Sequence, residues 1–177
     1  MVVGMGTRTT RVENEIIEYL PRMRRFARSL SRDQADADDL VQLTVERALT
    51  RLDQWQAGTR LDSWMYRIMK NAWIDETRRR QRQGRHHAPP EAGENVGADD
   101  PDFEKRMRAM AVKRAMETLP DDQRLAVSLV LVEGLSYKEA SSVIDVPMGT
   151  LTSRLARGRK AMEAQLNPSA MEGQSDD

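Results

Sequence analysis

Four hydroxyl and guanidinium side chains near the end of the chain have the spacing of one helix face. Thr150, Ser153, Arg154 and Arg157 lie three or four residues apart, and the leucines between them fall on another face. Hydroxyls near a helix N-terminus, with arginines that form paired hydrogen bonds to guanine or phosphate, suit the DNA major groove. A solvated, arginine-rich helix end is the alternative, because cations also stabilise a helix C-terminus. The pattern alone leaves both interpretations open.

The residues before this helix favour the DNA interpretation. Ser136 and Glu139 have the spacing of a capping box, which begins a helix by satisfying its first backbone N–H groups. That helix ends near Asp145, and after Val146–Pro147 a last helix runs from about Met148 to Leu166. Two short helices joined by a tight turn, the second basic on one side, predict a helix-turn-helix.

A second basic stretch lies in the front half and interleaves aromatic with cationic residues. Its members are Trp64, Tyr66, Arg67, Lys70, Trp73, Arg78 and Arg79. Stacking on aromatic rings combined with electrostatic attraction is how proteins hold single-stranded DNA. Trp64 is better explained as a core residue, whereas Trp73 fits either role. The preceding loop, Leu52–Leu61, contains Gly58 and small polar residues that would permit close approach of an extruded base.

The distribution of charge supports separate phosphate-facing and protein-facing surfaces. Net charge is zero, yet residues 60–88 hold eight Arg or Lys against three acids, and residues 148–161 hold four and no acid. The compensating acids lie between Asp33 and Asp39 and between Glu91 and Glu104. Segregated charge of this kind is typical of a protein with a nucleic-acid partner.

The elements that position these residues all have helical periodicity. Helices are predicted around Leu20–Leu30, with Pro21 in a first turn, then over Asp36–Arg51, Leu61–Arg80, Phe103–Leu119 and Asp121–Glu133, with Gly134 as a stop. Residues 83–102 are rich in Pro, Gly and acids, a composition that predicts a flexible linker.

The predicted fold is therefore all-α, with two small helical domains joined by a flexible acidic linker. The predicted divisions are a disordered N-terminus at 1–12, a first domain at 13–82, the linker at 83–102, a helix-turn-helix domain at 103–167 and a disordered tail at 168–177.

Composition argues against several classes of protein. The absence of cysteine excludes disulfides and thiolate sites, no apolar run approaches a membrane span, and the first ten residues do not resemble a signal peptide. A cytoplasmic protein without membrane insertion is expected. The two histidines, His86 and His87, are adjacent and lack further ligands or catalytic partners, so neither a metal site nor an enzyme is expected, and no cofactor.

Three motifs in order resemble the extracytoplasmic-function (ECF) family of RNA polymerase sigma factors. Residues 37–49 (ADDLVQLTVERAL) resemble that family's polymerase-binding helix. Residues 61–68 (LDSWMYRI), with Asn71, Asp75 and Arg78–Arg79, resemble its −10 recognition helix. Leu119–Pro120, residues 133–140 (EGLSYKEA) and residues 146–157 (VPMGTLTSRLAR) resemble its −35 domain. The resemblance spans about Leu20 to Leu166.

The resemblance implies a role for each stretch in transcription initiation at promoter DNA. It implies that core RNA polymerase is bound through its β′ clamp helices by Asp38, Asp39, Leu40, Gln42, Leu43, Thr44 and Arg47. It implies that −10 DNA is bound by Trp55, Arg60, Lys70, Asn71, Asp75, Arg78 and Arg79. It implies that −35 DNA is bound by Ser136, Tyr137, Lys138, Met148, Thr150, Thr152, Ser153, Arg154 and Arg157, with this domain on the β flap. It further implies control by an anti-sigma factor.

Three residues depart from the family pattern, and two rival functions stay open. Leu43 stands where the family usually has an acid, Thr152 replaces a usual Arg or Lys, and Ala156 replaces a bulky residue. A helix-turn-helix regulator that does not use polymerase would leave residues 38–80 without a role. A sigma mimic that only sequesters an anti-sigma factor would not need Arg78, Arg79, Arg154 and Arg157.

Overall fold

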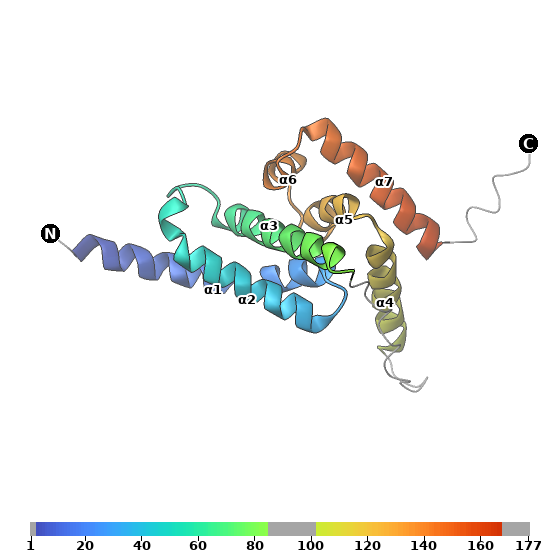
Figure 1. Cartoon of the computed structure of the whole chain (residues 1–177), viewed down its shortest axis with the longest axis horizontal. Coiled ribbons are helices and arrows are strands. Elements are labelled where there is room, and N and C mark those ends of the chain that lie inside the picture. The colour runs from blue at the N-terminus through green and yellow to red at the C-terminus, as the bar shows by residue number, and fades with distance from the viewer. Residues whose placement is uncertain (1–2, 85–101, 168–177) are drawn as a thin grey trace, which may run out of the picture.

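The computed structural model describes residues 3–84 and 102–167, and every regular element in those ranges is a helix. The front half contains α1 (Val3–Leu30), α2 (Gln34–Thr50) and α3 (Leu61–Arg82), with a short 3₁₀ turn, η1 (Leu52–Gln54), before α3. The back half contains α4 (Phe103–Thr118), α5 (Asp121–Val127), the π-helical η2 (Ser128–Val132), α6 (Tyr137–Ile144) and α7 (Met148–Leu166) (Figure 1). The all-α, two-part prediction is confirmed; the predicted linker lies mostly, and His86 and His87 wholly, outside the described residues.

Helix α1 is longer than its sequence indicates. It begins at Val3, so most of the segment predicted to be disordered is helical, and Pro21 lies in the helix interior and not in a first turn. Proline removes one backbone hydrogen bond from a helix interior. Burial of Ile16, Met23 and Phe26 on one face of α1 holds the helix continuous across that gap.

Helices α2 and α3 complete a three-helix bundle with α1. The Asp33 carboxylate accepts a hydrogen bond from the Asp36 N–H at 2.8 Å and so caps the start of α2. In the bundle core Phe26 meets Tyr66 edge to face, with ring centroids 5.0 Å apart. Trp73 is buried too, which resolves its two possible roles in favour of the core.

The helix predicted over Asp121–Glu133 is α-helical only as far as Val127. The next five residues form a π-helix, in which the Glu133 N–H donates to the Ser128 carbonyl at 3.0 Å. Gly134 follows with φ of +70°, a conformation that favours glycine, and stops the helix as predicted. Wide π turns are frequent at functional positions. This one fixes the direction of Glu133.

The helix-turn-helix is confirmed, with its capping box intact. Ser136 and Glu139 each bond the other's backbone N–H, at 3.3 and 2.9 Å. The helix α7 is held against α5 by buried Leu151 and Leu155, and by Gly158. A methyl group on Gly158 would lie 2.7 Å from Val127 Cγ2, so only glycine permits this close crossing.

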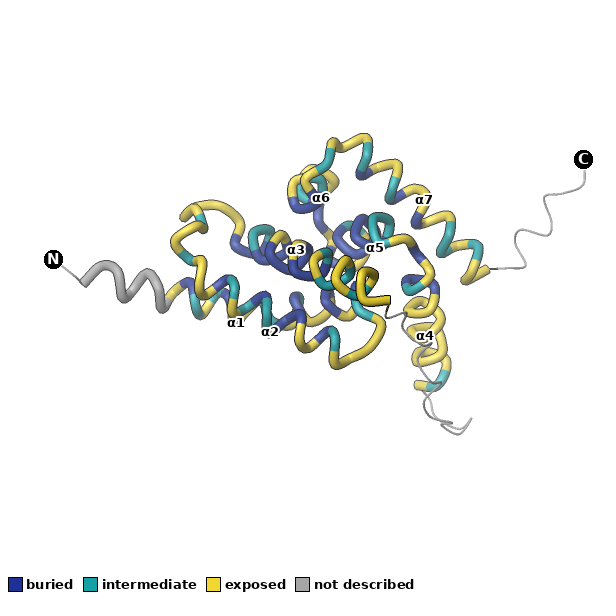
Figure 2. Tube along the Cα trace, viewed as in Figure 1, coloured by how far each residue is buried: buried dark blue, intermediate teal, exposed yellow. Residues whose placement is uncertain are grey.

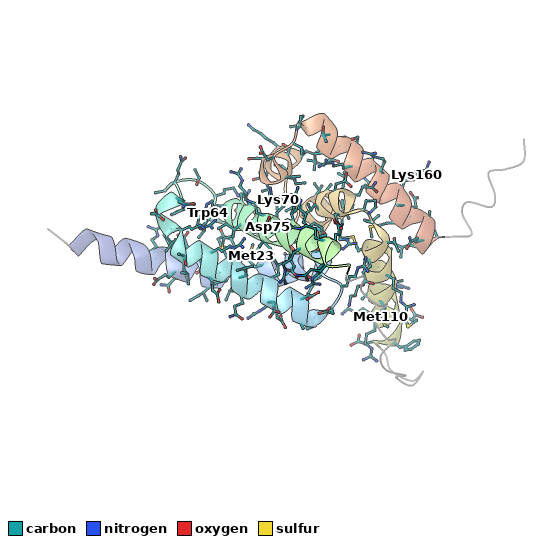
Figure 3. All side chains as sticks on the ribbon, viewed as in Figure 1. Met23, Trp64, Lys70, Asp75, Met110 and Lys160 are labelled. Atoms are coloured by element: carbon teal, nitrogen blue, oxygen red, sulfur yellow. The ribbon has the colours of Figure 1, made fainter. Side chains whose placement is uncertain are left out.

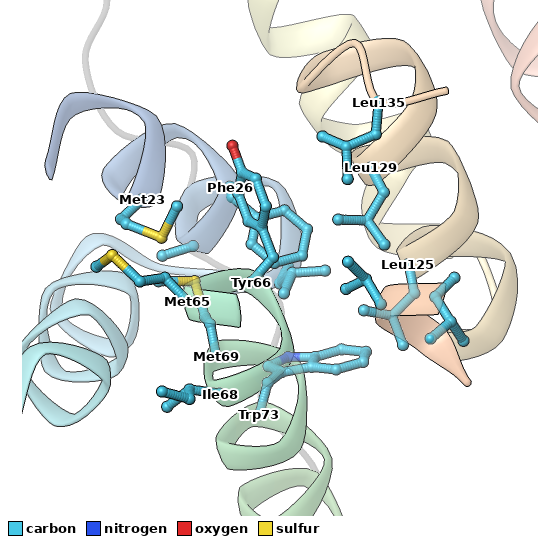
Figure 4. Close-up of a cluster of buried hydrophobic side chains, with 14 of the residues drawn as sticks. Met23, Phe26, Met65, Tyr66, Ile68, Met69, Trp73, Leu125, Leu129 and Leu135 are labelled. Atoms are coloured by element: carbon cyan, nitrogen blue, oxygen red, sulfur yellow. The ribbon is translucent and has the colours of Figure 1, made fainter. Parts of the chain in front are cut away.

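The two halves pack together through one continuous core. Figure 4 shows Phe26, Tyr66 and Trp73 of the front half facing Leu125, Leu129 and Leu135 of the back half. The tube in Figure 2 is buried along these inward faces and exposed on its outer faces, including most of α4.

A buried arginine also crosses this junction. Arg124 donates to the carbonyl groups of Met116, Glu117 and Leu119 at the end of α4, and to that of Leu30 at the end of α1. The closed arrangement of the two halves could not be read from the sequence. Within the described ranges, no helix combines the length and apolarity that crossing a membrane requires.

Candidate nucleic-acid interface

The outer face of α7 presents the predicted groove-reading side chains to solvent. Thr152, Ser153 and Arg157 are exposed, and Thr150 is half-buried. The hydroxyls of Thr152 and Ser153 donate to backbone carbonyls one turn earlier, at 2.8 and 3.0 Å, so both hydroxyl oxygens can still accept a hydrogen bond. The buried leucines on the opposite face fix this row on a rigid helix.

Arg154 lies differently from its neighbours. Its Nε is 3.1 Å from Asp122 Oδ2 on α5, and the side chain is only 24 % exposed. It therefore ties α7 to α5, whereas the sequence had placed it on the reading face with Arg157. Ser136, Tyr137 and Lys138 at the start of α6 and Met148 at the start of α7 are exposed as well.

Helix α6 packs against α3 and bonds part of its basic face. Lys70 is only 7 % exposed, and Arg67 donates to the carbonyl and hydroxyl of Ser142 at 2.9 and 3.2 Å. Arg60 pairs with Asp62 beside it and with Glu139 on α6. Burial lowers the pKa of Lys70, and the neighbouring Arg67 lowers it further. Two predicted −10 contacts, Arg60 and Lys70, are thus engaged within the protein.

The C-terminal half of α3 remains open. Asn71, Asp75, Arg78 and Arg79 are exposed, and Figure 3 labels Asp75 with Lys70 on α3. Arg79 forms two hydrogen bonds with Glu76, at 2.9 and 3.0 Å, and the bond from Arg79 is the main reason that the pKa of Glu76 is lowered.

Arg80 has a structural role at the end of α3. It pairs with Glu76 and also with Asp36 of α2, at 2.6 Å. Part of the local positive charge is therefore neutralised within the fold.

The loop before α3 has the open geometry expected of it. Trp55 is half-buried, and its indole N–H is buried without a hydrogen-bond acceptor among the described residues. Gly58 has φ of +92°, with open space where a side chain would stand. The backbone at Gly58 is therefore open to close approach.

The predicted polymerase-binding residues divide between surface and core. Asp38, Asp39 and Gln42 are exposed, and Leu43 and Arg47 are half-buried. Leu40 and Thr44 are buried, and Thr44 donates its hydroxyl to the Leu40 carbonyl at 2.7 Å. Because the core occupies both side chains, we remove Leu40 and Thr44 from the predicted docking surface.

A cluster around Glu133 was missed by reasoning from sequence. The Glu133 side chain is 0 % exposed; it accepts two hydrogen bonds from Arg25, at 2.9 and 3.0 Å, and one from the Tyr66 hydroxyl at 2.7 Å. Arg22 Nε lies 3.7 Å away. Burial raises the pKa of the Tyr66 hydroxyl, and the bond to Glu133 raises it further. The only signal in the sequence was an acid directly before the stop glycine.

Comparisons with known proteins match both halves of the chain. Residues 16–70 match the family model described as the Sigma2 domain of PhyR, and residues 109–162 match Sigma-70, region 4. The ECF RNA polymerase sigma factor EcfG of Rhodopseudomonas palustris is 32 % identical over 158 residues, which are 89 % of this chain and 86 % of that protein. The ECF RNA polymerase sigma factor SigE of Mycolicibacterium smegmatis is 37 % identical over 84 % of this chain and 59 % of its own length.

Solved structures agree with the family matches. The sigma factor RpoE of Bartonella quintana, in complex with the anti-sigma factor NepR, has a TM-score of 0.75 at 28 % identity and covers 90 % of this chain and 98 % of its own. CnrH, in complex with the cytosolic domain of CnrY, shares the fold with a TM-score of 0.68 at 21 % identity and covers 94 % of this chain and 92 % of its own. By sequence and by fold, this chain belongs to the ECF RNA polymerase sigma factors.

Proposed function

We propose that this sigma factor binds core RNA polymerase through α2, captures single-stranded −10 DNA on α3 and its preceding loop, and reads duplex −35 DNA with α7. The observation that carries the proposal is the outer face of α7, where Thr152, Ser153 and Arg157 are exposed on a helix seated by buried leucines. A rigid helix with hydroxyls and a long donor on its free face suits the major groove. In this role the protein has no catalytic chemistry of its own and works in the cytoplasm.

The proposed contacts in the front half rest on exposure and charge. Arg78 and Arg79 would attract the backbone of the melted strand, Asn71 and Asp75 would face its bases, and Trp55 borders the loop. Arg60 and Lys70 would join them only after α6 moves. On α2, the surface offered to the β′ clamp helices consists of Asp38, Asp39, Gln42, Leu43 and Arg47.

We further propose control by an anti-sigma factor of the NepR type. The support is the similarity to RpoE of Bartonella quintana, which was solved in complex with NepR, over nearly the whole of both chains. A partner that stabilises the closed arrangement would keep Lys70 buried and would keep Arg60 and Arg67 bonded to α6. Co-purification of the chain with NepR would test this step.

Run-off transcription with purified core polymerase tests the central proposal. The chain should direct initiation at a promoter selected by sequencing of the transcripts, and Arg157→Ala should reduce the yield. Exposed Arg159 on the same helix is outside the predicted contact set, so Arg159→Ala is the matched control. DNA binding without stimulation of core polymerase would instead identify a simple helix-turn-helix regulator.

A sigma mimic is the second candidate, and one observation favours it. A protein that only sequesters an anti-sigma factor tolerates a covered α3, as seen here with Lys70 and Arg67 engaged by α6. Such a protein would bind the anti-sigma factor yet leave core polymerase inactive under every condition. The same run-off assay, with and without the anti-sigma factor, separates the two functions.

A further inference from the structure

Helix α6 and the residue that ends it offer acceptor or acidic groups to three basic residues, Arg60 at the N-cap of α3 and Arg67 and Lys70 on the helix itself. Glu139 pairs with Arg60, and the backbone and hydroxyl oxygens of Ser142 accept from Arg67. Asp145, which ends α6 in a left-handed conformation at φ of 64°, acts electrostatically on Lys70 and favours its charged form. Three cations at and near the start of α3 are therefore matched from one short helix, and of these Lys70 is buried while Arg60 and Arg67 are bonded but exposed.

The oxygens that α6 offers to these cations resemble chemically the phosphate oxygens of a nucleic acid. A single strand bound along α3 would offer phosphate oxygens to the same cations and stack its bases nearby. The carboxylate of Glu139 and the carbonyl of Ser142 stand where such oxygens would stand. Both ligands cannot occupy this surface at once, because Lys70 is already 93 % covered in the closed arrangement (7 % exposed).

Glu133 fixes the back half in this position. Its buried carboxylate belongs to the back half, whereas the groups that bond it, Arg25 and Tyr66 with Arg22 close by, belong to the front half. The nearby Arg22 also pairs with Asp62 at 3.1 Å, and Asp62 in turn pairs with Arg60. The cluster thus connects through Asp62 to Arg60, which pairs with Glu139 of α6.

We propose that α6 is an internal competitor for the single-stranded DNA surface of α3, held there by the buried Glu133. The inference rests on the proposed function of α3. The chain then exists in closed and open forms, and only the open form binds the strand through Arg60 and Lys70. Its apparent affinity for single-stranded DNA is reduced by the fraction that is open. Any change that weakens the Glu133 cluster should raise that affinity.

Glu133→Gln is the sharpest variant to test the competitor. It keeps the shape of the side chain but replaces the carboxylate that pairs with Arg25 and Arg22. Those arginines are 51 % and 31 % exposed, so water can solvate them after the loss. Glu163→Gln is the matched control, because it makes the same charge change on exposed α7.

Opening is measured first and without DNA. The chain has no cysteine, so Glu18→Cys on α1 and Lys160→Cys on α7, both exposed, give a clean dye pair for energy transfer. Transfer efficiency should fall in Glu133→Gln and stay unchanged in Glu163→Gln. Unchanged transfer in Glu133→Gln would overturn the proposal.

Binding is measured second, by anisotropy with a short fluorescein-labelled single-stranded DNA of mixed sequence. Loss of hydrogen bonds to a buried charge should raise the affinity by about tenfold in Glu133→Gln. Adding Lys70→Ala should remove most of that gain. Opening without any gain in affinity would overturn the competitor. The run-off assay would then decide separately whether the function proposed for α3 fails as well.

Two further variants keep the test decisive if Glu133→Gln folds poorly. Tyr66→Phe removes only the hydroxyl that donates to Glu133 and keeps the ring against Phe26. Arg25→Ala removes the paired bonds from a side chain that is half exposed. Circular dichroism confirms folding of each. Both should open the chain to a smaller extent than Glu133→Gln. If the chain stays closed in both variants, the Glu133 cluster does not hold the two halves together.

Discussion

Helices α3 and α7 carry the two faces predicted to bind DNA, and these faces differ in the closed arrangement. On α3, Lys70 is buried and the exposed Arg67 is bonded to Ser142 of α6, whereas on α7 Thr152, Ser153 and Arg157 face solvent. The face on α7 was predicted from helical spacing, and that on α3 from its interleaved aromatic and cationic residues. Spacing identifies which side chains share a face, but it does not identify what lies on that face.

The difference follows from where each helix finds its packing partners. The apolar side of α7 packs against α5 through Leu151, Leu155 and Gly158, and most of its polar side faces solvent. The apolar side of α3 packs against α1 and α2, and its remaining surface borders the back half of the chain through Trp73 and Lys70. A face at a junction between domains can be regulated by movement of the domains, and an outer face cannot.

Removing a buried leucine that packs α7 against its neighbours should have the largest effect on stability and on −35 binding. Leu151 is fully buried between α7 and its neighbours, so Leu151→Ala should lower the free energy of unfolding by about 2–5 kcal/mol. Binding to −35 duplex DNA should be lost, while α3 should retain the single-strand binding of its exposed C-terminal half. Urea unfolding and the two binding assays check this. Equal loss of both activities would show that α3 and α7 fold as one unit.

The close crossing of α7 and α5 gives a slightly smaller effect with a built-in rescue. Gly158→Ala places a methyl group 2.7 Å from Val127 Cγ2, and overpacking of this kind costs about 1–3 kcal/mol. Adding Val127→Ala removes the clashing methyl and should restore −35 binding. Thermal unfolding and duplex binding report the two effects. If Val127→Ala does not restore binding, the clash is not the cause.

Local patterns predicted much of the fold because they are local in origin. The capping box at Ser136 and Glu139, the stop at Gly134 and the start of α7 near Met148 follow from short-range backbone chemistry, and all three are confirmed. The continuation of α1 through Pro21 depends on burial against distant helices, and no rule for a single segment predicts it.

The site was less predictable than the fold, because the spacing of residues within one helix does not show which distant residues they pair with. Arg154 shares a helical face with Arg157 in sequence, yet Asp122, more than thirty residues away, engages it. Thr44 has a polar side chain but bonds its own helix in the core. Glu133 has an ordinary position at a helix end, and only the three-dimensional fold surrounds it with arginines.

Breaking the Arg154–Asp122 pair should lower the affinity for all −35 sequences by a similar amount. If Arg154 positions α7, Arg154→Ala should weaken all −35 sequences by a similar amount, about 1 kcal/mol or less for a partly exposed pair. Exchange of the two charges, Arg154→Asp with Asp122→Arg, should recover most of the loss. A binding series over single-base −35 variants measures this. A loss confined to one base pair would assign Arg154 to base reading.

The smallest effect should distinguish two adjacent arginines at the open end of α3. Arg78 and Arg79 are both exposed, and replacing either by alanine removes one positive charge at nearly the same place. Arg79 is already bonded twice to Glu76, whereas Arg78 contributes its backbone carbonyl to Arg82 and leaves its guanidinium toward solvent. A phosphate contact on a single strand contributes about 0.7 to the slope of log affinity against log salt concentration. Arg78→Ala should reduce the slope by about that amount, and Arg79→Ala by less, because Glu76 competes with the phosphate for Arg79.

The measurement uses Glu133→Gln as background, so that α6 does not mask the strand-binding surface of α3. Permanganate footprinting of the open promoter should rank the variants in the same order. Equal slopes for the two variants would mean that the bond to Glu76 yields to phosphate without cost, so that α3 presents a continuous basic edge at its open end.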